Sequence, residues 1–133
     1  MSNIDKVSVI QRQLIGDERG WFLKAINGKE DRIPNHTGEV YLTMGITGQI
    51  KGGHYHPKAL EWFTLIRGEA ILYLEDVETR QKKQVLMSFE SPKTVFVPNN
   101  VAHAFKNVGD SEMIILAYTD DLYDPLDTIA YKL

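Results

Sequence analysis

The sequence has 133 residues and contains no cysteine. This absence excludes disulfide bonds, zinc sites built from thiolates and cysteine nucleophiles, and it fits a reducing compartment. The sequence also lacks an apolar run long enough to cross a bilayer, and its first residues lack the charged-then-apolar order of a signal peptide. We therefore expect a cytoplasmic protein that does not bind a membrane.

No basic stretch is present that could follow a phosphate backbone, and the formal net charge is −3. Nucleic acid is therefore not an expected partner. No linker, repeat or low-complexity tract divides the chain, and its length suits one domain better than two. We expect a single domain over residues 1–133.

Sustained helical periodicity is also missing, so few helices are expected. Short β-rich runs recur instead, separated by Gly, Asn and Asp. They cover residues 7–14, 21–26, 40–46, 60–66, 70–77, 94–97, 102–108 and 113–118. This pattern predicts an all-β sandwich or barrel.

A sheet protein of this size has open strand edges, and an open edge favours pairing with a second copy. We therefore expect a homodimer. Residues 7–14 and 128–133 are the predicted interface strands.

Ligand-type side chains gather in two short blocks. His54 and His56 lie two apart, so on a strand they point to the same face. Glu61 follows after Pro57, which predicts a turn that resets the strand phase, and His103 lies in a later run. Three imidazoles and one carboxylate suit a divalent transition metal, either Zn, Fe, Ni, Mn or Cu.

The complete pattern is Gly-x5-His-x-His-x4-Glu-x6-Gly from Gly48 to Gly68, followed by a block from Pro98 through His103 to Asn107. These blocks resemble the two motifs of the cupin superfamily. The resemblance implies a jelly-roll barrel, the double-stranded β-helix, with His54, His56, Glu61 and His103 as metal ligands. Asn100 replaces a usual turn glycine, which Asn can do because it tolerates a positive φ.

A second resemblance concerns the substrate. Residues 17–22 are similar to the Asp-x-Arg-Gly-x-Phe block of dTDP-4-dehydrorhamnose 3,5-epimerases, and residues 51–54 are similar to their Arg-Gly-x-His block. The chain also resembles the C-terminal cupin domain of capsular polysaccharide UDP-sugar epimerase/reductases, which is associated with zinc. More distantly, it resembles dTDP-4-keto-6-deoxyglucose 3,4-ketoisomerases. These resemblances imply a nucleotide-linked 4-keto sugar as the small-molecule partner, and zinc as the first choice of metal.

Such a reaction needs a base that removes a proton next to the ketone. His54 is the predicted base if no metal holds it; otherwise Tyr41, Tyr55, His36 or metal-bound water must act. Tyr118 is a further catalytic candidate, because it lies near the position where the epimerases carry an acid tyrosine. Arg19 and Lys51 are predicted to grip the diphosphate, since cationic groups complement phosphate oxygens.

Two other functions fit the same residues. The chain could be a metal-binding cupin module without its own catalysis. Alternatively, it could be a metal-dependent small-sugar isomerase or a dioxygenase. The first hypothesis is a sugar-nucleotide epimerase or ketoisomerase in surface polysaccharide synthesis. It is favoured by the block at residues 17–22 and by residues 119–125, which resemble the segment near the end of the cupin core of the epimerases.

Overall fold

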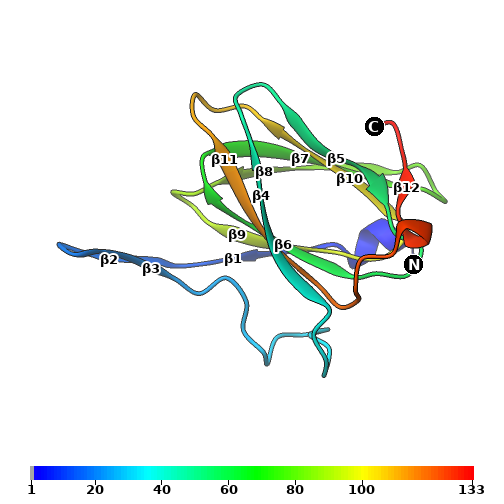
Figure 1. Ribbon diagram of the computed structural model, residues 1–133, viewed down its shortest axis with the longest axis horizontal. Coiled ribbons are helices and arrows are strands. Elements are labelled where there is room, and N and C mark those ends of the chain that lie inside the picture. The colour runs from blue at the N-terminus through cyan, green and yellow to red at the C-terminus, as the bar shows by residue number, and fades with distance from the viewer. Residues whose placement is uncertain (1) are drawn as a thin grey trace.

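A computed structural model describes residues 2–133, which fold into two antiparallel sheets packed face to face (Figure 1). The first sheet has the order β1 (Ser8–Gln11), β9 (Lys93–Val97), β6 (Glu61–Arg67), β11 (Met113–Thr119) and β4 (Glu39–Gly45). The second has the order β12 (Ile129–Ala130), β5 (Ile50–Tyr55), β10 (Val101–Asn107), β7 (Glu69–Asp76) and β8 (Lys82–Ser88). A separate hairpin joins β2 (Leu14–Asp17) to β3 (Gly20–Leu23), and the helical segments of the described residues are two 3-10 turns, η1 (Asn3–Lys6) and η2 (Pro125–Asp127).

The predicted all-β architecture is confirmed, but three segments differ from prediction. Residues 7–14 form two elements rather than one, because the Arg12 side chain turns inward to Glu30 and Thr94 and interrupts the strand. Strand β5 was not predicted from the sequence, because its two glycines lower strand propensity. Strand β8 was hidden by Lys82 and Lys83, which stand exposed at its start.

The main core fills the space between the two sheets. Along β6, Phe63 and Leu65 point into this core, as the period of two predicts. Trp62 points to the opposite face, where it packs against Phe96 and Tyr118. The first sheet is therefore buried on both faces along part of its length.

The outer face of the first sheet is covered by the long connection between β3 and β4, which hangs below the barrel in Figure 1. Ile26 and Ile33 of this connection pack on the Trp62 cluster. Arg12 and Glu30 form a largely buried ion pair beside it. This covering stops short of β4, where Leu42 stays 62% exposed.

The β2–β3 hairpin extends away from the barrel (Figure 1, left). Ile15, Trp21 and Phe22 are each 58% exposed on it. The Trp21 and Phe89 rings meet edge to face, with centroids 4.8 Å apart, at the side of the barrel. The hairpin thus carries apolar side chains that remain largely exposed to solvent.

Within residues 2–133, none of the helical segments has the length and apolar character needed to span a bilayer.

Candidate active site

The four predicted ligand residues come together at one end of the barrel. His54 lies at the end of β5, His56 just after it, Glu61 at the start of β6 and His103 on β10. Strand pairing places His54 directly opposite His103. Gly52 makes this approach possible: its φ is 101°, and a Cβ there would lie 2.9 Å from the His103 carbonyl oxygen.

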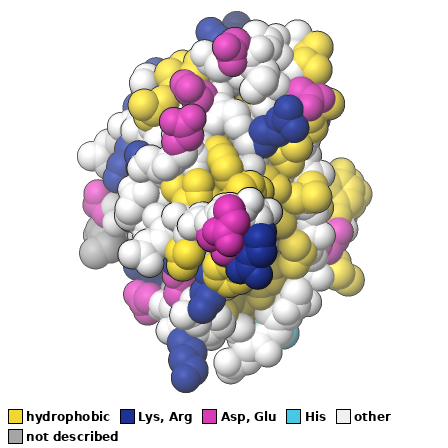
Figure 2. All heavy atoms as spheres, turned by 90° about the vertical axis from the view of Figure 1, so that its left-hand side faces the viewer, with side chains coloured by type: hydrophobic (Ala, Val, Ile, Leu, Met, Phe, Trp, Pro, Cys, Tyr) yellow, Lys and Arg dark blue, Asp and Glu magenta, His cyan; other side chains and the backbone are white. Residues whose placement is uncertain are grey.

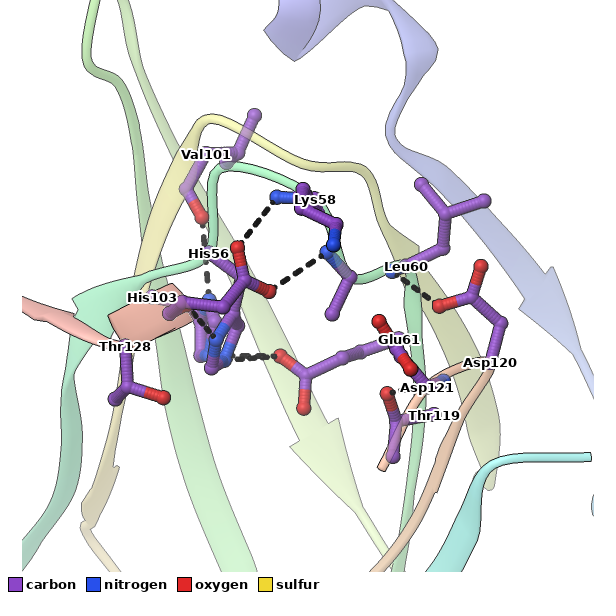
Figure 3. Close-up of polar contacts among 12 residues, drawn as sticks. His56, Lys58, Leu60, Glu61, Val101, His103, Thr119, Asp120, Asp121 and Thr128 are labelled. Carbon is purple, nitrogen blue, oxygen red and sulfur yellow. Dashed lines mark hydrogen bonds and ion pairs between the residues drawn. The ribbon is translucent and has the colours of Figure 1, made fainter. Parts of the chain in front are cut away.

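Glu61 points at two of the histidines (Figure 3). Its Oε1 lies 3.0 Å from His56 Nε2 and 3.2 Å from His103 Nε2. The nitrogen atoms available for ligation on His54, His56 and His103 all lie within 4.8 Å of one another. Ligand atoms about 2.0 Å from a tetrahedral zinc ion would be roughly 3.3 Å apart, so small side-chain movements would bring these nitrogens to the spacing of a metal site.

The other nitrogen of each of two rings is already occupied. His56 Nδ1 lies 2.8 Å from the Asp127 carbonyl oxygen, and His103 Nδ1 lies 3.2 Å from the Val101 carbonyl oxygen. A carbonyl can only accept, so in each ring Nδ1 is the donor. When such a ring is neutral, the lone pair of Nε2 points toward Glu61; when it is protonated, Nε2 donates to Glu61 instead. Such outer hydrogen bonds commonly orient metal-binding histidines.

Within residues 2–133, His56 Nε2, Glu61 Oε1 and His103 Nε2 are buried and face one another at ion-pair distance, but no hydrogen bond joins them to any other group. All three are acceptors when the rings are neutral, and facing acceptors repel one another. Either a shared proton or a cation resolves this repulsion. The residues present therefore fit a bound metal ion.

Electrostatics differ among the titratable groups of the site. Burial, helped by His103 and His56, lowers the pKa of His54 to about 4. Burial also lowers the pKa of His56, but the adjacent Glu61 carboxylate raises it, and the net change is upward. Burial alone would raise the pKa of Glu61, whereas its contacts with His103 and His56 hold it well below the ordinary value.

A cavity of about 330 Å³ opens beside the quartet. Its wall includes Tyr41, His54, His56, Glu61, Thr119 and the segment from Asp121 to Asp124. The Tyr41 hydroxyl donates to Glu61 Oε2 at 3.3 Å. Burial and the Glu61 charge raise the pKa of Tyr41, so its phenol remains protonated. Tyr41 and His54 thus line one cavity, and their catalytic roles stay a prediction.

The structure does not bring the third catalytic candidate to this cavity. Tyr118 pairs with Trp62 on the outer face of the first sheet, and its hydroxyl donates to the His36 carbonyl oxygen at 3.0 Å. Its neighbour in sequence, Thr119, faces inward and lines the cavity. Successive residues of a strand point to opposite faces, so the prediction of Tyr118 as a catalytic residue was one position away from the side chain that faces the cavity.

The two predicted phosphate-binding residues also lie outside the cavity wall. Arg19 stands at the tip of the β2–β3 hairpin, where its Nη2 contacts Asp17 Oδ2 at 2.7 Å and its side chain is 85% exposed. Lys51 pairs with Phe105 on β10, and a Cβ on Gly45 would lie 3.2 Å from its Cγ. Neither side chain reaches the quartet within this chain, so their role in substrate binding stays a prediction.

Sequence reasoning missed the contribution of the chain end. Asp127 is only 7% exposed and contacts the turn between His56 and Glu61. The resemblance at residues 119–125 stopped short of Asp127, and Pro125 indicated only a 3-10 turn after a capping Asp124. Nothing in the sequence indicated which turn this segment would meet.

Comparison with known proteins identifies the family. Residues 15–131 match the family described as the polysaccharide biosynthesis C-terminal domain, and the chain belongs to it. The chain is 29% identical over 127 residues to the spore coat polysaccharide biosynthesis protein SpsL of Bacillus subtilis, covering 92% of this chain and 83% of that protein. It is 25% identical over 130 residues to a probable low-salt glycan biosynthesis epimerase of Haloferax volcanii, covering 93% and 83% of the two chains.

The fold has a solved counterpart. A dTDP sugar isomerase from Desulfovibrio desulfuricans superposes with a TM-score of 0.87 at 17% identity, covering 95% of this chain and 83% of that one. This likeness confirms the predicted cupin fold.

Proposed function

We propose that this protein epimerises a 4-keto nucleotide sugar during the synthesis of a surface polysaccharide. One observation carries the proposal: the cavity is lined both by the imidazole of His54, from the second sheet, and by the protonated phenol of Tyr41, from the first. The names of the relatives support it, since they include polysaccharide and glycan biosynthesis proteins, an epimerase and a dTDP sugar isomerase.

The reaction follows from the acidity of a carbon next to a ketone. His54 removes the proton from that carbon, and the electron pair of the broken C–H bond forms an enolate. Tyr41 donates its hydroxyl hydrogen toward the enolate oxygen or returns a proton to carbon. Return of a proton to the opposite face of the carbon inverts the centre. If that carbon carries a hydroxyl, protonation of the former carbonyl carbon and loss of the hydroxyl proton instead move the ketone to the neighbouring carbon.

We further propose that the quartet binds a divalent transition metal, with zinc as the first choice and Fe, Ni or Mn as alternatives. The three orphaned acceptor atoms support this proposal. His56, Glu61 and His103 would hold the ion, with His54 as the fourth ligand. When bound, such an ion supplies a Lewis acid that polarises a ketone oxygen.

Metal binding by His54 would compete with its use as a base, because one lone pair cannot serve both. Among residues 2–133, His54 makes no ring hydrogen bond comparable to those of His56 and His103. The facing acceptor atoms therefore favour a second candidate function, a metal-binding module without catalysis. In that case the ion binds to all four residues and no proton is exchanged.

Exchange of substrate hydrogen with heavy water separates the two candidates. A dTDP- or UDP-linked 4-keto sugar incubated with the protein should take up deuterium next to the ketone. His54→Asn should abolish the exchange, whereas His36→Asn, a change of a histidine outside the cavity, should leave it intact. Full metal loading with no exchange on either nucleotide sugar would instead identify a binding module.

We also propose a homodimer, formed through a surface different from the predicted one. Hydrophobic side chains gather on the face from which the hairpin projects (Figure 2). On β4 and the loop after it they are Val40, Leu42, Met44 and Ile46, and on the hairpin they are Ile15, Trp21 and Phe22; each is 44% to 62% exposed. Seven half-exposed side chains of this size supply an area on the order of the 800 Å² that each partner buries in a standard interface.

Sedimentation velocity tests the dimer. Leu42→Glu should convert it to a monomer, because a carboxylate would be buried at the interface without a partner. Leu86→Glu is the matched control, since Leu86 is 58% exposed on β8 but lies outside this surface. A wild-type monomer at micromolar concentration would contradict the proposal.

A further inference from the structure

The turn that joins His56 to Glu61 is not part of a β-ladder. Strand β5 ends at Tyr55 and β6 begins at Glu61, so the turn residues between them lie outside both strands. Its backbone N–H groups at Lys58, Ala59 and Leu60 are three consecutive donors. Buried or half-buried donors of this kind need partners, because leaving them unpaired costs about 1–3 kcal/mol each.

The end of the chain supplies all three partners. Asp127 accepts from Lys58 N at 2.8 Å through Oδ1 and from Ala59 N at 3.1 Å through Oδ2. Asp120 accepts from Leu60 N at 2.9 Å through Oδ1 (Figure 3). Each acceptor is a carboxylate oxygen, and hydrogen bonds to ionised acceptors are stronger than neutral ones.

Asp127 also contacts the ring of His56 through its backbone. Its carbonyl oxygen lies 2.8 Å from His56 Nδ1, which makes Nδ1 the donor and leaves the Nε2 lone pair facing Glu61. One residue therefore touches the turn on both sides: the histidine before it and the amides that lead to Glu61. A shift of this residue would move His56 and Glu61 relative to each other.

The chain beyond Asp127 is attached to the next ligand. In β12, Ile129 pairs with Tyr55 and Ala130 pairs with His54, while Tyr131 N donates to the Gly53 carbonyl oxygen at 2.9 Å. Strand β12 thus holds the residues that follow Asp127 against β5. The segment 119–131 runs along the side of the site that also forms the cavity wall.

We propose that Asp127 is the positioning residue of the site, with Asp120 in a supporting role. It acts through other groups: its carboxylate sets the course of the turn into Glu61, and its carbonyl fixes the tautomer and orientation of His56. The inference concerns the geometry of the quartet, and the tautomer can be tested in the metal-free protein.

The direct test is the tautomer of His56, read from the ¹⁵N chemical shifts of its ring in metal-free protein. The wild type should carry its hydrogen on Nδ1. Asp127→Asn should weaken this preference, since an amide group can accept from only one of the two turn N–H groups and opposes the other. Asp124→Asn is the matched control, because its carboxylate caps Leu126 N in the same segment but does not contact the turn.

Metal affinity gives a second readout, measured by competition of Zn²⁺ with a chromogenic chelator. Asp127→Asn should weaken binding by about 10–100-fold, the usual cost of losing an outer-shell partner, and Asp120→Asn by less. Val85→Ala on β8 controls for general destabilisation and should keep the wild-type affinity. If Asp127→Asn does not fold, Asp120→Asn carries both measurements.

Distinct results would overturn the proposal. A wild-type tautomer together with wild-type zinc affinity in Asp127→Asn would show that this carboxylate does not position the site. An equal loss of affinity in Val85→Ala would show that the effect is only stability. If the wild-type protein binds no zinc, the metal proposal fails, and the His56 tautomer alone decides the role of Asp127.

Discussion

The turn before Glu61 and the β2–β3 hairpin were both recognisable as sequence blocks, but they differ in how far away in the sequence their hydrogen-bond partners lie. The turn is held by carboxylates that lie 60 to 69 positions away in the sequence. The Asp17–Arg19 pair at the hairpin tip spans two positions and is exposed. The comparison teaches that long-range bonds fix the geometry of a motif, whereas a purely local pair leaves its side chains in solvent.

The largest expected effect concerns Glu61, which follows the turn held by long-range hydrogen bonds. Glu61→Gln should weaken zinc binding by at least about 100-fold, because it removes a ligand rather than an outer-shell partner. Competition with a chelator measures the change. Glu39→Gln is the control, since Glu39 lines the same cavity but its carboxylate accepts from Tyr123 N. Unchanged affinity in Glu61→Gln would remove the carboxylate from the proposed metal site.

The two tryptophans allow the packed sheet and the exposed hairpin to be compared by their effect on the free energy of unfolding. Trp62 is 1% exposed and Trp21 is 58% exposed. Trp62→Ala should lower the free energy of unfolding by about 3–5 kcal/mol, because it leaves a cavity in a packed cluster. Trp21→Ala should cost much less under conditions where the protein is monomeric. Urea denaturation of both variants measures the difference, and equal losses would mean that the hairpin is packed in solution.

A smaller effect is expected at the ion pair under the β3–β4 connection. Arg12 Nη2 donates to Glu30 Oε1 at 2.7 Å, and this bond, with the charge of Arg12, lowers the pKa of Glu30. A lowered folded-state pKa means that Glu30 stabilises the protein above its unfolded pKa, and that this stability is lost as the pH falls through the folded value.

Glu30→Gln should therefore cost about 1 kcal/mol at pH 7 and almost nothing at a pH below the folded pKa of Glu30. Unfolding measured at both pH values for wild type and variant gives the comparison. Glu18→Gln, an exposed change on the hairpin, provides the control. A penalty that persists unchanged in acid would show that the Glu30 charge is not responsible.

The smallest effect on unfolding is expected at the hairpin tip. Arg19→Ala should leave the unfolding transition unchanged, because the Arg19 side chain is exposed and its ion pair is screened by water. The same variant tests the predicted diphosphate contact through the affinity for dTDP or UDP, measured by calorimetry. Lys24→Ala serves as the charge-matched control. Unchanged nucleotide affinity would exclude Arg19 from substrate binding.

The sequence was sufficient for the all-β fold class and for the four residues that meet at one end of the barrel. Alternation along β6 placed Phe63 inside and Trp62 outside, because a strand has a period of two. The turn predicted at Pro57 brought Glu61 to the inward face, and Asn100 does adopt a positive φ, of 63°. These features depend on a few neighbouring residues, so local sequence determines them.

Other features depended on contacts between distant segments. The strand face of Tyr118, the exposed position of Arg19 and the role of Asp127 each required the packed molecule. Their outcome is decided by which surfaces the sheets bury and by which carboxylate meets which amide. The sequence by itself therefore determined an all-β fold carrying three histidines and a glutamate. Only the tertiary structure decided how the turn before Glu61 and the ring of His56 are held, because their hydrogen bonds join residues far apart in the chain.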